Sequence, residues 1–237
     1  APDGGLYSLP THHFRVSQFS WLWRKNSFDR WGLKFPRTHD ELYAVLQTIK
    51  KNDPKSIPVP NRGGLGGQLD TFESIFHVQD GMYKDGITGQ LVKAGEATDR
   101  YREMLAYARK LYTNGKLDKE FATASIQQWT ERYAKGEAYM QYTFTRRWIW
   151  AQELQQKLDP ATKWEWSPEL ISAYPNEGYI YHRDQPFWNR GYIITKRATP
   201  EKRDKLLALL DWFASDEGVL FQNYGIEGET FTYKDGV

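Results

Sequence analysis

Aromatic rings beside directional polar groups are the side chains of this sequence best suited to chemistry. Its 237 residues include 10 Trp, 15 Tyr and 12 Phe, an aromatic share of 16% in a chain whose charged share is 26%. Core packing accounts for part of this content. Several tryptophans nevertheless adjoin arginine, asparagine or glutamine, as in Arg147-Trp148 and Trp188-Asn189. Flat apolar faces combined with hydrogen-bonding groups are what a sugar ring requires.

The pair Arg146-Arg147 beside Trp148 suits one further ligand group. A guanidinium matches a carboxylate in a bidentate manner, so these residues could bind an acidic sugar. Neutral sugars are also held by Arg and Trp, so this pattern leaves the choice between acidic and neutral oligosaccharides open.

Residue patterns typical of enzymes are missing. The five histidines show no H-E-x-x-H spacing, and His12 and His13 are adjacent, so in a strand their rings would point to opposite sides. No G-x-S-x-G nucleophile motif occurs. The glycine-rich stretch 61–67 lacks the Lys-Ser/Thr of a P-loop and the spacing of a dinucleotide fingerprint. A glycosidase needs only two carboxylates that face a sugar. Many pairs among the 30 acidic residues could meet this need, so the sequence leaves a glycosidase open. We expect no catalysis, no metal and no cofactor.

Charge and composition restrict the partners. With 32 Lys and Arg against 30 Asp and Glu, the formal charge of +2 is too balanced for a nucleic-acid binder. The chain has no cysteine, which excludes disulfides and thiolate chemistry. It holds no apolar run of the length that spans a bilayer, and residues 1–5 do not resemble a secretion signal.

Strands and helices alternate along the sequence, which indicates an α/β fold. We expect Trp21 and Trp23, two apart in a strand, to share a core face.

Thr38 and Glu41 form a capping box, and Thr199-Pro200-Glu201 is a second helix start. Predicted strands cover residues 6–9, 17–24, 138–144, 179–182 and 191–196; predicted helices cover 25–31, 38–53, 70–78, 98–114, 125–135, 146–158 and 199–213, with a further turn reaching 224. Residues 61–67 are expected to form a loop, and Asp85-Gly86 a hairpin turn.

Several segments, in order over nearly the whole chain, carry a resemblance to a known family. They are Gly5-Leu6-Tyr7-Ser8-Leu9-Pro10-Thr11, Trp21-Leu22-Trp23-Arg24-Lys25, Trp31-Gly32-Leu33-Lys34-Phe35-Pro36-Arg37-Thr38, Asp40-Glu41-Leu42-Tyr43-Ala44-Val45-Leu46, Leu111-Tyr112-Thr113-Asn114-Gly115-Lys116-Leu117-Asp118-Lys119-Glu120-Phe121, Gly191-Tyr192-Ile193-Ile194-Thr195-Lys196, Ala214-Ser215-Asp216-Glu217-Gly218 and Asn223-Tyr224-Gly225-Ile226-Glu227-Gly228. The sequence resembles the extracellular solute-binding proteins of family 1. In particular it is similar to their long oligosaccharide-binding branch, which includes periplasmic alginate-binding proteins and Gram-positive sugar-binding lipoproteins.

This resemblance implies a fold and a domain organisation. We expect one α/β lobe of a periplasmic-binding-protein-like (type II) two-lobe fold, its sheet flanked by helices. The lobe covers residues 1–237, with 1–12 as the crossover or hinge segment and 225–237 as the return segment. Because family members are much longer, we expect the chain to be a fragment whose second lobe is missing, and to bind oligosaccharides only at about millimolar strength. The calcium loop of the branch has too few oxygen ligands at residues 52–58, so no calcium is expected there.

The resemblance also implies a function and a place for the ligand. The expected function is capture of an oligosaccharide outside the cytoplasm, in the periplasm or on a cell-surface lipoprotein, for the permease subunits of an ABC importer. A carbohydrate-active enzyme and a polysaccharide-adhesion domain are the alternatives. In such proteins the ligand lies between two lobes, where loops at strand ends supply the contacts. The candidate ligand-binding residues are His12, His13 and Gln18 after the crossover, Tyr142, Arg146 and Trp148 at the exit of the strand 138–144, and Trp188, Asn189 and Arg190 before the strand at Gly191.

Overall fold

The computed structural model describes residues 8–10, 19–79, 81–84, 89–93, 99–167, 170–177 and 191–233. The chain divides into two compact units. Unit 1 consists of Ala1–Phe14 and Gln185–Val237, and unit 2 of Arg15–Asp184. Within the part that the structure describes, no helix combines the length and the apolar character of a membrane span.

Unit 2 is built on a three-stranded antiparallel sheet. The strands are β2 (Phe19–Arg24), β5 (Met140–Phe144) and β6 (Trp164–Ser167), in the order β5-β2-β6. Trp21 stands opposite Tyr142 on β5 and Ser167 on β6. In this antiparallel arrangement the start of β2 and the ends of β5 and β6 lie at the same end of the sheet.

One face of this sheet packs against three helices. They are α2 (His39–Asn52), α3 (Gly64–Phe76) and α4 (Asp99–Thr113). The residues that fill the space between them are apolar and buried: Phe19, Trp21, Leu42, Val45, Leu46, Ile49, Phe72, Ile75, Phe76, Met104, Tyr107, Leu111, Met140 and Tyr142. Trp21 is fully buried and Trp23 packs against the same cluster, which confirms that these two residues belong to the core.

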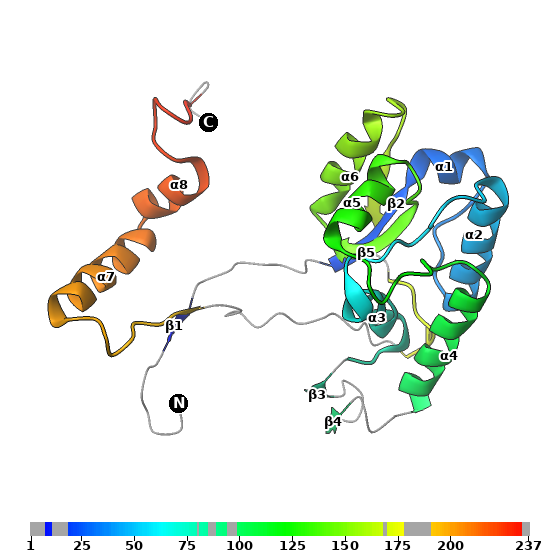
Figure 1. The fold of residues 1–237 in the computed structure, drawn as a ribbon, viewed down its shortest axis with the longest axis horizontal. Helices are drawn as coiled ribbons and strands as arrows, with labels where there is room; N and C mark the ends of the chain where they lie inside the picture. The colour runs from blue at the N-terminus through cyan, green and yellow to red at the C-terminus, as the bar shows by residue number, and fades with distance from the viewer. Residues whose placement is uncertain are drawn as a thin grey trace. The chain divides into compact units, whose positions relative to one another are not determined.

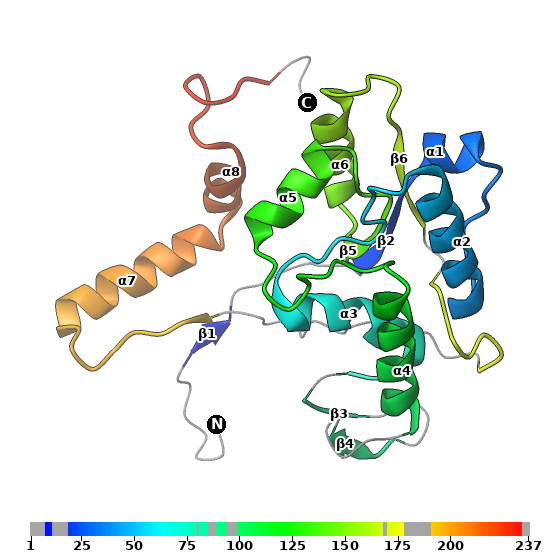
Figure 2. The same cartoon turned by 45° about the vertical axis from the view of Figure 1, so that its right-hand side comes forward.

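The other face of the sheet carries a second, smaller core. Helices α5 (Ile126–Ala134) and α6 (Arg147–Gln156) cover it, on the opposite side of β2 from α2 (Figures 1 and 2). Its buried residues are Leu22, Trp129, Tyr133, Ala138, Ala151 and Trp164. Unit 2 is therefore a layered α/β structure with helices on both faces of the sheet.

Local sequence signals explain where two of these helices begin. Thr38 accepts from the backbone N–H of Glu41 and forms the predicted capping box of α2. Ser125 and Gln128 form a second capping box at α5. Each box satisfies backbone donors that the first turn of a helix leaves free. Helix α1 spans Lys25–Arg30, directly after β2, as predicted.

The structure differs from the sequence prediction at α3, which begins at Gly64 rather than near residue 70. The Asn61 side chain organises this start: its Oδ1 accepts from Gly63 N at 3.0 Å and its Nδ2 donates to Gly64 O at 2.6 Å. Gly63 and Gly64 adopt positive φ values of 152° and 61°, which glycine tolerates without strain. Asn61 Nδ2 also donates to the carbonyl of Phe121, and Gly64 N donates to the carbonyl of Ala124 at 2.9 Å. The expectation of a loop throughout 61–67 was therefore wrong, because these hydrogen bonds override the weak helix propensity of glycine.

Several strand predictions also change. Strand β6 was not predicted, β5 starts at Met140 rather than 138, and the strand expected over 191–196 is limited to β7 (Gly191–Tyr192). Strands β3 (Met82–Lys84) and β4 (Leu91–Lys93) pair antiparallel, in agreement with a hairpin. The predicted turn at residues 85–86 and the predicted strand 179–182 lie outside the described residues.

Unit 1 contains a two-stranded pair and two helices. Strand β1 (Leu9–Pro10) pairs antiparallel with β7, and helices α7 (Pro200–Phe213) and α8 (Asp216–Tyr224) follow. Thr199 caps α7 as predicted, by accepting from Lys202 N. A Cβ atom at Gly218 would lie 1.9 Å from the carbonyl oxygen of Trp212, so the tight junction between α7 and α8 requires glycine. The description of residues 1–237 as a single lobe stays a prediction.

Candidate functional site

The turn between β5 and α6 brings polar and aromatic candidates to one end of the sheet in unit 2. Strand β5 ends at Phe144 and α6 begins at Arg147, with Arg146 as its N-cap residue. Arg146 is exposed, whereas Arg147 and Trp148 are half-buried. Of the predicted ligand-binding residues, Arg146 and Trp148 therefore lie together in the first turn of one helix.

Tyr142, also predicted as a ligand-binding residue, lies in the larger core. It is 5% exposed, and its ring centroid lies 5.7 Å from those of both Phe19 and Trp21. In this structure its ring therefore belongs to the core packing of the sheet. A direct contact with the ligand stays a prediction.

Two arginines flank Phe144 at this end of the sheet. The guanidinium carbon of Arg62, just before α3, lies 5.6 Å from the centroid of the Phe144 ring, and that of Arg147 lies 5.7 Å from it. Arg147 also lies over the Trp129 ring at 4.9 Å. Burial, and then repulsion from Arg62 and Arg146, lower the pKa of Arg147, although an arginine still stays charged at neutral pH.

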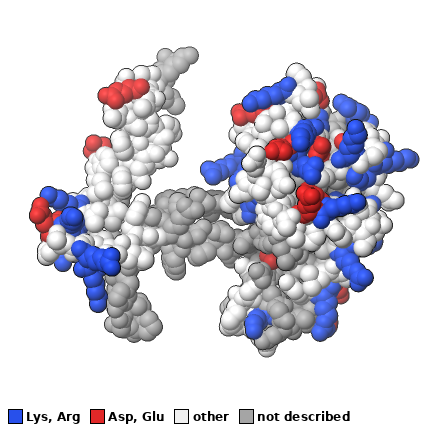
Figure 3. Space-filling model, viewed as in Figure 1, with Lys and Arg blue, Asp and Glu red and all other residues white. Residues whose placement is uncertain are grey.

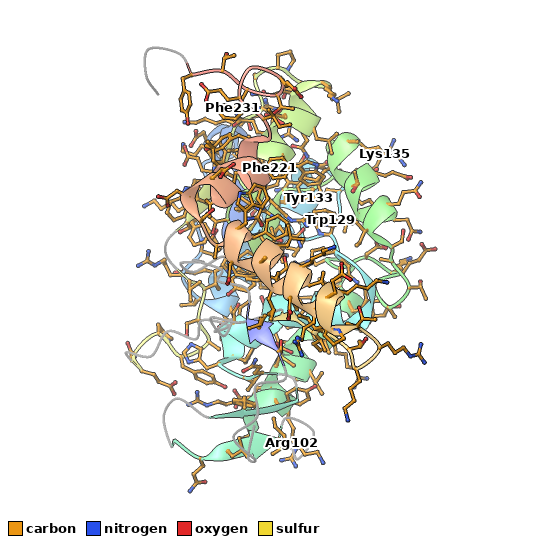
Figure 4. All side chains as sticks on the ribbon, turned by 90° about the vertical axis from the view of Figure 1, so that its left-hand side faces the viewer. Arg102, Trp129, Tyr133, Lys135, Phe221 and Phe231 are labelled. Carbon is orange, nitrogen blue, oxygen red and sulfur yellow. The ribbon has the colours of Figure 1, made fainter. Side chains whose placement is uncertain are left out.

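A stack of aromatic rings from α5 and α6 supports Arg147. The Trp129 and Trp150 rings are nearly parallel, at 13°, with centroids 4.8 Å apart. Tyr133, one turn after Trp129 on α5, packs beside it with a centroid distance of 5.2 Å (Figure 4). Buried Gln141 on β5 accepts hydrogen bonds from Trp129 Nε1 at 2.7 Å and from the Tyr133 hydroxyl at 3.0 Å. The platform beneath Arg147 is thus held by both packing and hydrogen bonds.

From the first turn of α6, a groove of about 780 Å³ runs between this helix and the edge strand β6. Its walls are formed by Trp148, Gln152, Gln156, Thr162, Lys163, Trp164, Glu165 and Trp166. Gln152 accepts from the backbone N–H of Trp164 at 3.1 Å, and Gln156 donates to the carbonyl of Thr162 at 3.0 Å. Trp166 remains 47% exposed. The groove thus combines indole surface with amide and charged groups, the mixture expected for sugar rings.

Sequence reasoning missed two parts of this site. Arg62 was considered only as part of a possible phosphate loop and was not predicted as a site residue. Its position just before a glycine-rich helix start was the signal that could have indicated it. Trp166 was missed with β6, although the alternation Trp164-Glu165-Trp166-Ser167 is typical of a strand. The remaining candidates, namely His12, His13, Gln18, Trp188, Asn189 and Arg190, lie outside the described residues.

The segment 52–58, where the resemblance locates a calcium loop, offers oxygens that other groups already use. The Lys50 ammonium donates to the carbonyl oxygens of Pro54 at 2.6 Å and Ser56 at 2.7 Å. The carboxylate of Asp53 accepts from the Tyr139 hydroxyl at 2.9 Å. Calcium takes six to eight oxygen ligands, so these residues do not fit it. Among the described residues no three His, Asp or Glu lie together as metal ligands.

Comparison with known families decides the relationship of the chain. The model of the bacterial extracellular solute-binding proteins matches residues 4–220. The chain belongs to this family. The resemblance seen in the sequence is thereby confirmed, and membership supports a location outside the cytoplasm.

Two curated relatives of this solute-binding protein come from Bacillus subtilis (strain 168). Lipoprotein LipO is 26% identical over 230 residues, covering 91% of this chain and 43% of LipO. The polygalacturonan/rhamnogalacturonan-binding protein YtcQ is 25% identical over 253 residues, covering 98% of this chain and 48% of YtcQ. The chain therefore spans about half the length of the curated relatives it matches.

Solved structures confirm the fold class of this solute-binding protein. The alginate-binding protein AlgQ2 matches with a TM-score of 0.77 at 21% identity, over 100% of this chain and 49% of that chain. The substrate-binding protein FusA of S. pneumoniae in complex with kestose matches with a TM-score of 0.69 at 20% identity, over 97% and 48%. These likenesses show an α/β lobe of the periplasmic-binding-protein-like fold.

Proposed function

We propose that this chain supplies part of the surface with which a solute-binding protein captures an oligosaccharide for an ABC importer, without chemical change. The observation that carries the proposal is the gathering of Arg146, Arg147 and Trp148 at the end of β5, beside the groove lined by Trp166. Flat indole faces suit the apolar faces of sugar rings, and guanidinium and amide groups suit their oxygens. YtcQ is named as a polygalacturonan/rhamnogalacturonan-binding protein and FusA as a fructooligosaccharide ABC transporter substrate-binding protein, which supports this chemistry.

The proposal extends to the predicted residues and partners that the described part of the chain does not test. His12, His13, Gln18, Tyr142, Trp188, Asn189 and Arg190 are proposed as further contacts with the oligosaccharide. The proposed protein partners are the permease subunits of the importer and a second lobe of the same protein. The proposed location is the periplasm or the cell surface, as a lipoprotein.

A glycan panel tests the proposal. We expect the tryptophan fluorescence of the chain to change saturably with at least one oligosaccharide, because indoles line the groove, and we expect no new reducing ends on prolonged incubation. Trp148→Ala should weaken binding about fivefold to tenfold, the effect of losing one aromatic face.

Tyr112→Ala, an exposed aromatic on α4, is the matched control and should bind like the unchanged chain. Release of reducing ends would favour the carbohydrate-active enzyme. Binding to long polymers alone, with no response to oligosaccharides, would favour an adhesion domain.

A further inference from the structure

The segment 52–58 is closed by a side chain from the helix that precedes it. Lys50 lies in the last turn of α2 and is half-buried. Its ammonium donates to the carbonyl oxygens of Pro54 at 2.6 Å and Ser56 at 2.7 Å. A lysine in this place often binds the last carbonyls of its own helix. Here both carbonyls lie beyond the end of α2, so the bonds fix the segment rather than the helix.

Further polar groups of the segment are also bound within the protein. The carbonyl oxygen of Asp53 accepts from the Ser56 hydroxyl at 2.6 Å, and the Asp53 carboxylate accepts from the Tyr139 hydroxyl at 2.9 Å. The Ile57 N–H donates to the carbonyl of Glu137 at 3.0 Å. The segment therefore has a defined shape although it does not offer the six to eight oxygen ligands that calcium takes.

The same segment anchors the start of β5. The carbonyl oxygen of Pro58 accepts from the backbone N–H groups of Tyr139 at 3.1 Å and Met140 at 2.8 Å. Met140 is the first residue of β5, and the other end of this strand leads into the candidate site at α6. Whatever closes the segment 52–58 therefore helps to position a strand of that site.

The charges at the segment disfavour a calcium ion. A metal and the Lys50 ammonium would compete for the carbonyl oxygens of Pro54 and Ser56, and at such short separations two positive charges repel strongly. Figure 3 shows one face of unit 2, on which the described acidic side chains lie among basic ones. That face offers no concentrated negative charge to offset the repulsion.

We propose that the Lys50 ammonium takes the place of the calcium ion of the branch in this chain, by tying the carbonyls of Pro54 and Ser56 together and keeping the segment against the start of β5. Like the metal, an ammonium is a cation that binds carbonyl oxygens, but it makes at most three hydrogen bonds and is attached to the helix itself. Hydrogen bonds from a charged donor are about twice as strong as neutral ones, so two of them suffice for a short segment. Lys50 is thus a positioning residue.

The first test uses the unchanged 237-residue chain. Thermal unfolding is followed by circular dichroism with a chelator and with about 10 mM calcium, which exceeds the dissociation constants of weak extracellular calcium modules. We expect the two Tm values to agree within about 1 °C, because only a ligand that binds the folded state stabilises it. A Tm several degrees higher in calcium would overturn the proposal.

A pair of variants tests the ammonium. Lys50→Met removes the donor but keeps an unbranched side chain of similar helix propensity. We expect it to lower Tm by about 5 °C, because two charge-assisted hydrogen bonds are lost. Lys51→Met is the matched control, because Lys51 is exposed in the same turn of α2, and it should leave Tm unchanged. Equal losses in the two variants would contradict the proposal.

A spectroscopic measurement reports on the two hydrogen bonds directly. In a proton–nitrogen correlation spectrum of the lysine side chains, ammonium protons that are bonded within the protein exchange slowly with water and give a visible signal. Lys50→Met should remove one such signal, and Lys51→Met should remove none. If Lys50→Met removes no protected signal, the bonds do not form in solution and the proposal is wrong. None of these measurements needs a glycan, so their outcomes are independent of the proposed function.

Discussion

At the scale of single residues, Gln141 explains how an aromatic platform is fixed beneath a charged site. Its side chain is 1% exposed, and its Oε1 serves two donors, Trp129 Nε1 and the Tyr133 hydroxyl. Burial raises the pKa of Tyr133, so the hydroxyl stays protonated and donates. The glutamine thereby fixes the orientation of the ring on which Arg147 rests.

Replacing this acceptor should be costly. Gln141→Leu keeps the approximate size of the side chain but leaves two buried donors unsatisfied, so we expect the free energy of unfolding to fall by about 3 kcal/mol. Urea unfolding followed by far-UV circular dichroism measures this loss. Adding Tyr133→Phe removes one of the orphaned donors, so the double variant should be more stable than Gln141→Leu alone. An equal or larger loss in the double variant would contradict the hydrogen-bond explanation.

At the scale of elements, capping side chains determine where two helices of unit 2 begin. Thr38 starts α2 and Ser125 starts α5, each through a reciprocal pair of hydrogen bonds with the residue three positions later. These bonds form within a few residues of chain, so they depend little on what the helix later packs against. Packing then adds the larger stabilisation, through Leu42, Leu46 and Ile49 in α2.

The cap of α2 can be tested against a threonine of the same helix. Thr38→Ala should lower the free energy of unfolding by about 1 kcal/mol, because the Glu41 backbone N–H loses its acceptor. Thr48→Ala, in the interior of α2, should change it little, because alanine is the better helix former. Chemical denaturation of both variants gives the comparison. Equal losses would show that the cap is not what Thr38 contributes.

At the scale of the whole molecule, the two units differ in how much apolar surface they bury. Helices α2 and α7 both have 14 residues and both start at a capping threonine. Helix α2 contains four buried residues and α7 contains none. Leu206, Leu207 and Leu209 of α7 are 42%, 38% and 43% exposed. Since most helical stability in proteins comes from packing, these two helices should differ strongly in local stability.

Hydrogen exchange measures this difference within one sample. We expect backbone amides in α7 to exchange at least about a hundredfold faster than those in α2, because local opening of α7 exposes little new apolar surface. The exchange is followed by mass spectrometry on peptides that separate the two helices. Similar protection in both helices would overturn the expectation, and dilution would then show whether association of copies covers α7.

The sequence by itself determined the family, the α/β class and most helix starts. It also assigned Trp21 and Trp23 to the core. The helix starts and the core assignment depend on short-range signals, namely capping residues three apart and alternation along one strand. The family assignment depends on short motifs that follow one another in order over nearly the whole chain. The end of β5 was predicted as a candidate site from its residue types and from the place at strand ends that the family resemblance implies for the ligand. The structure then brought Arg146 and Trp148 into one helical turn, and it located Tyr142 in the core.

Only the tertiary structure decided which distant residues meet at that site. Arg62 joins Arg147 beside Phe144, and β6 adds Trp166 to the groove along α6. The start of α3 at Gly64 depends on hydrogen bonds from Asn61 Nδ2 to the carbonyl of Phe121 and from Gly64 N to the carbonyl of Ala124, against the low helix propensity of glycine. Such contacts join residues far apart in the chain, and their free energy comes from burial and long-range pairing. Local periodicity in the sequence does not indicate burial or long-range pairing. A single sequence therefore shows the residue types but not which of them come together.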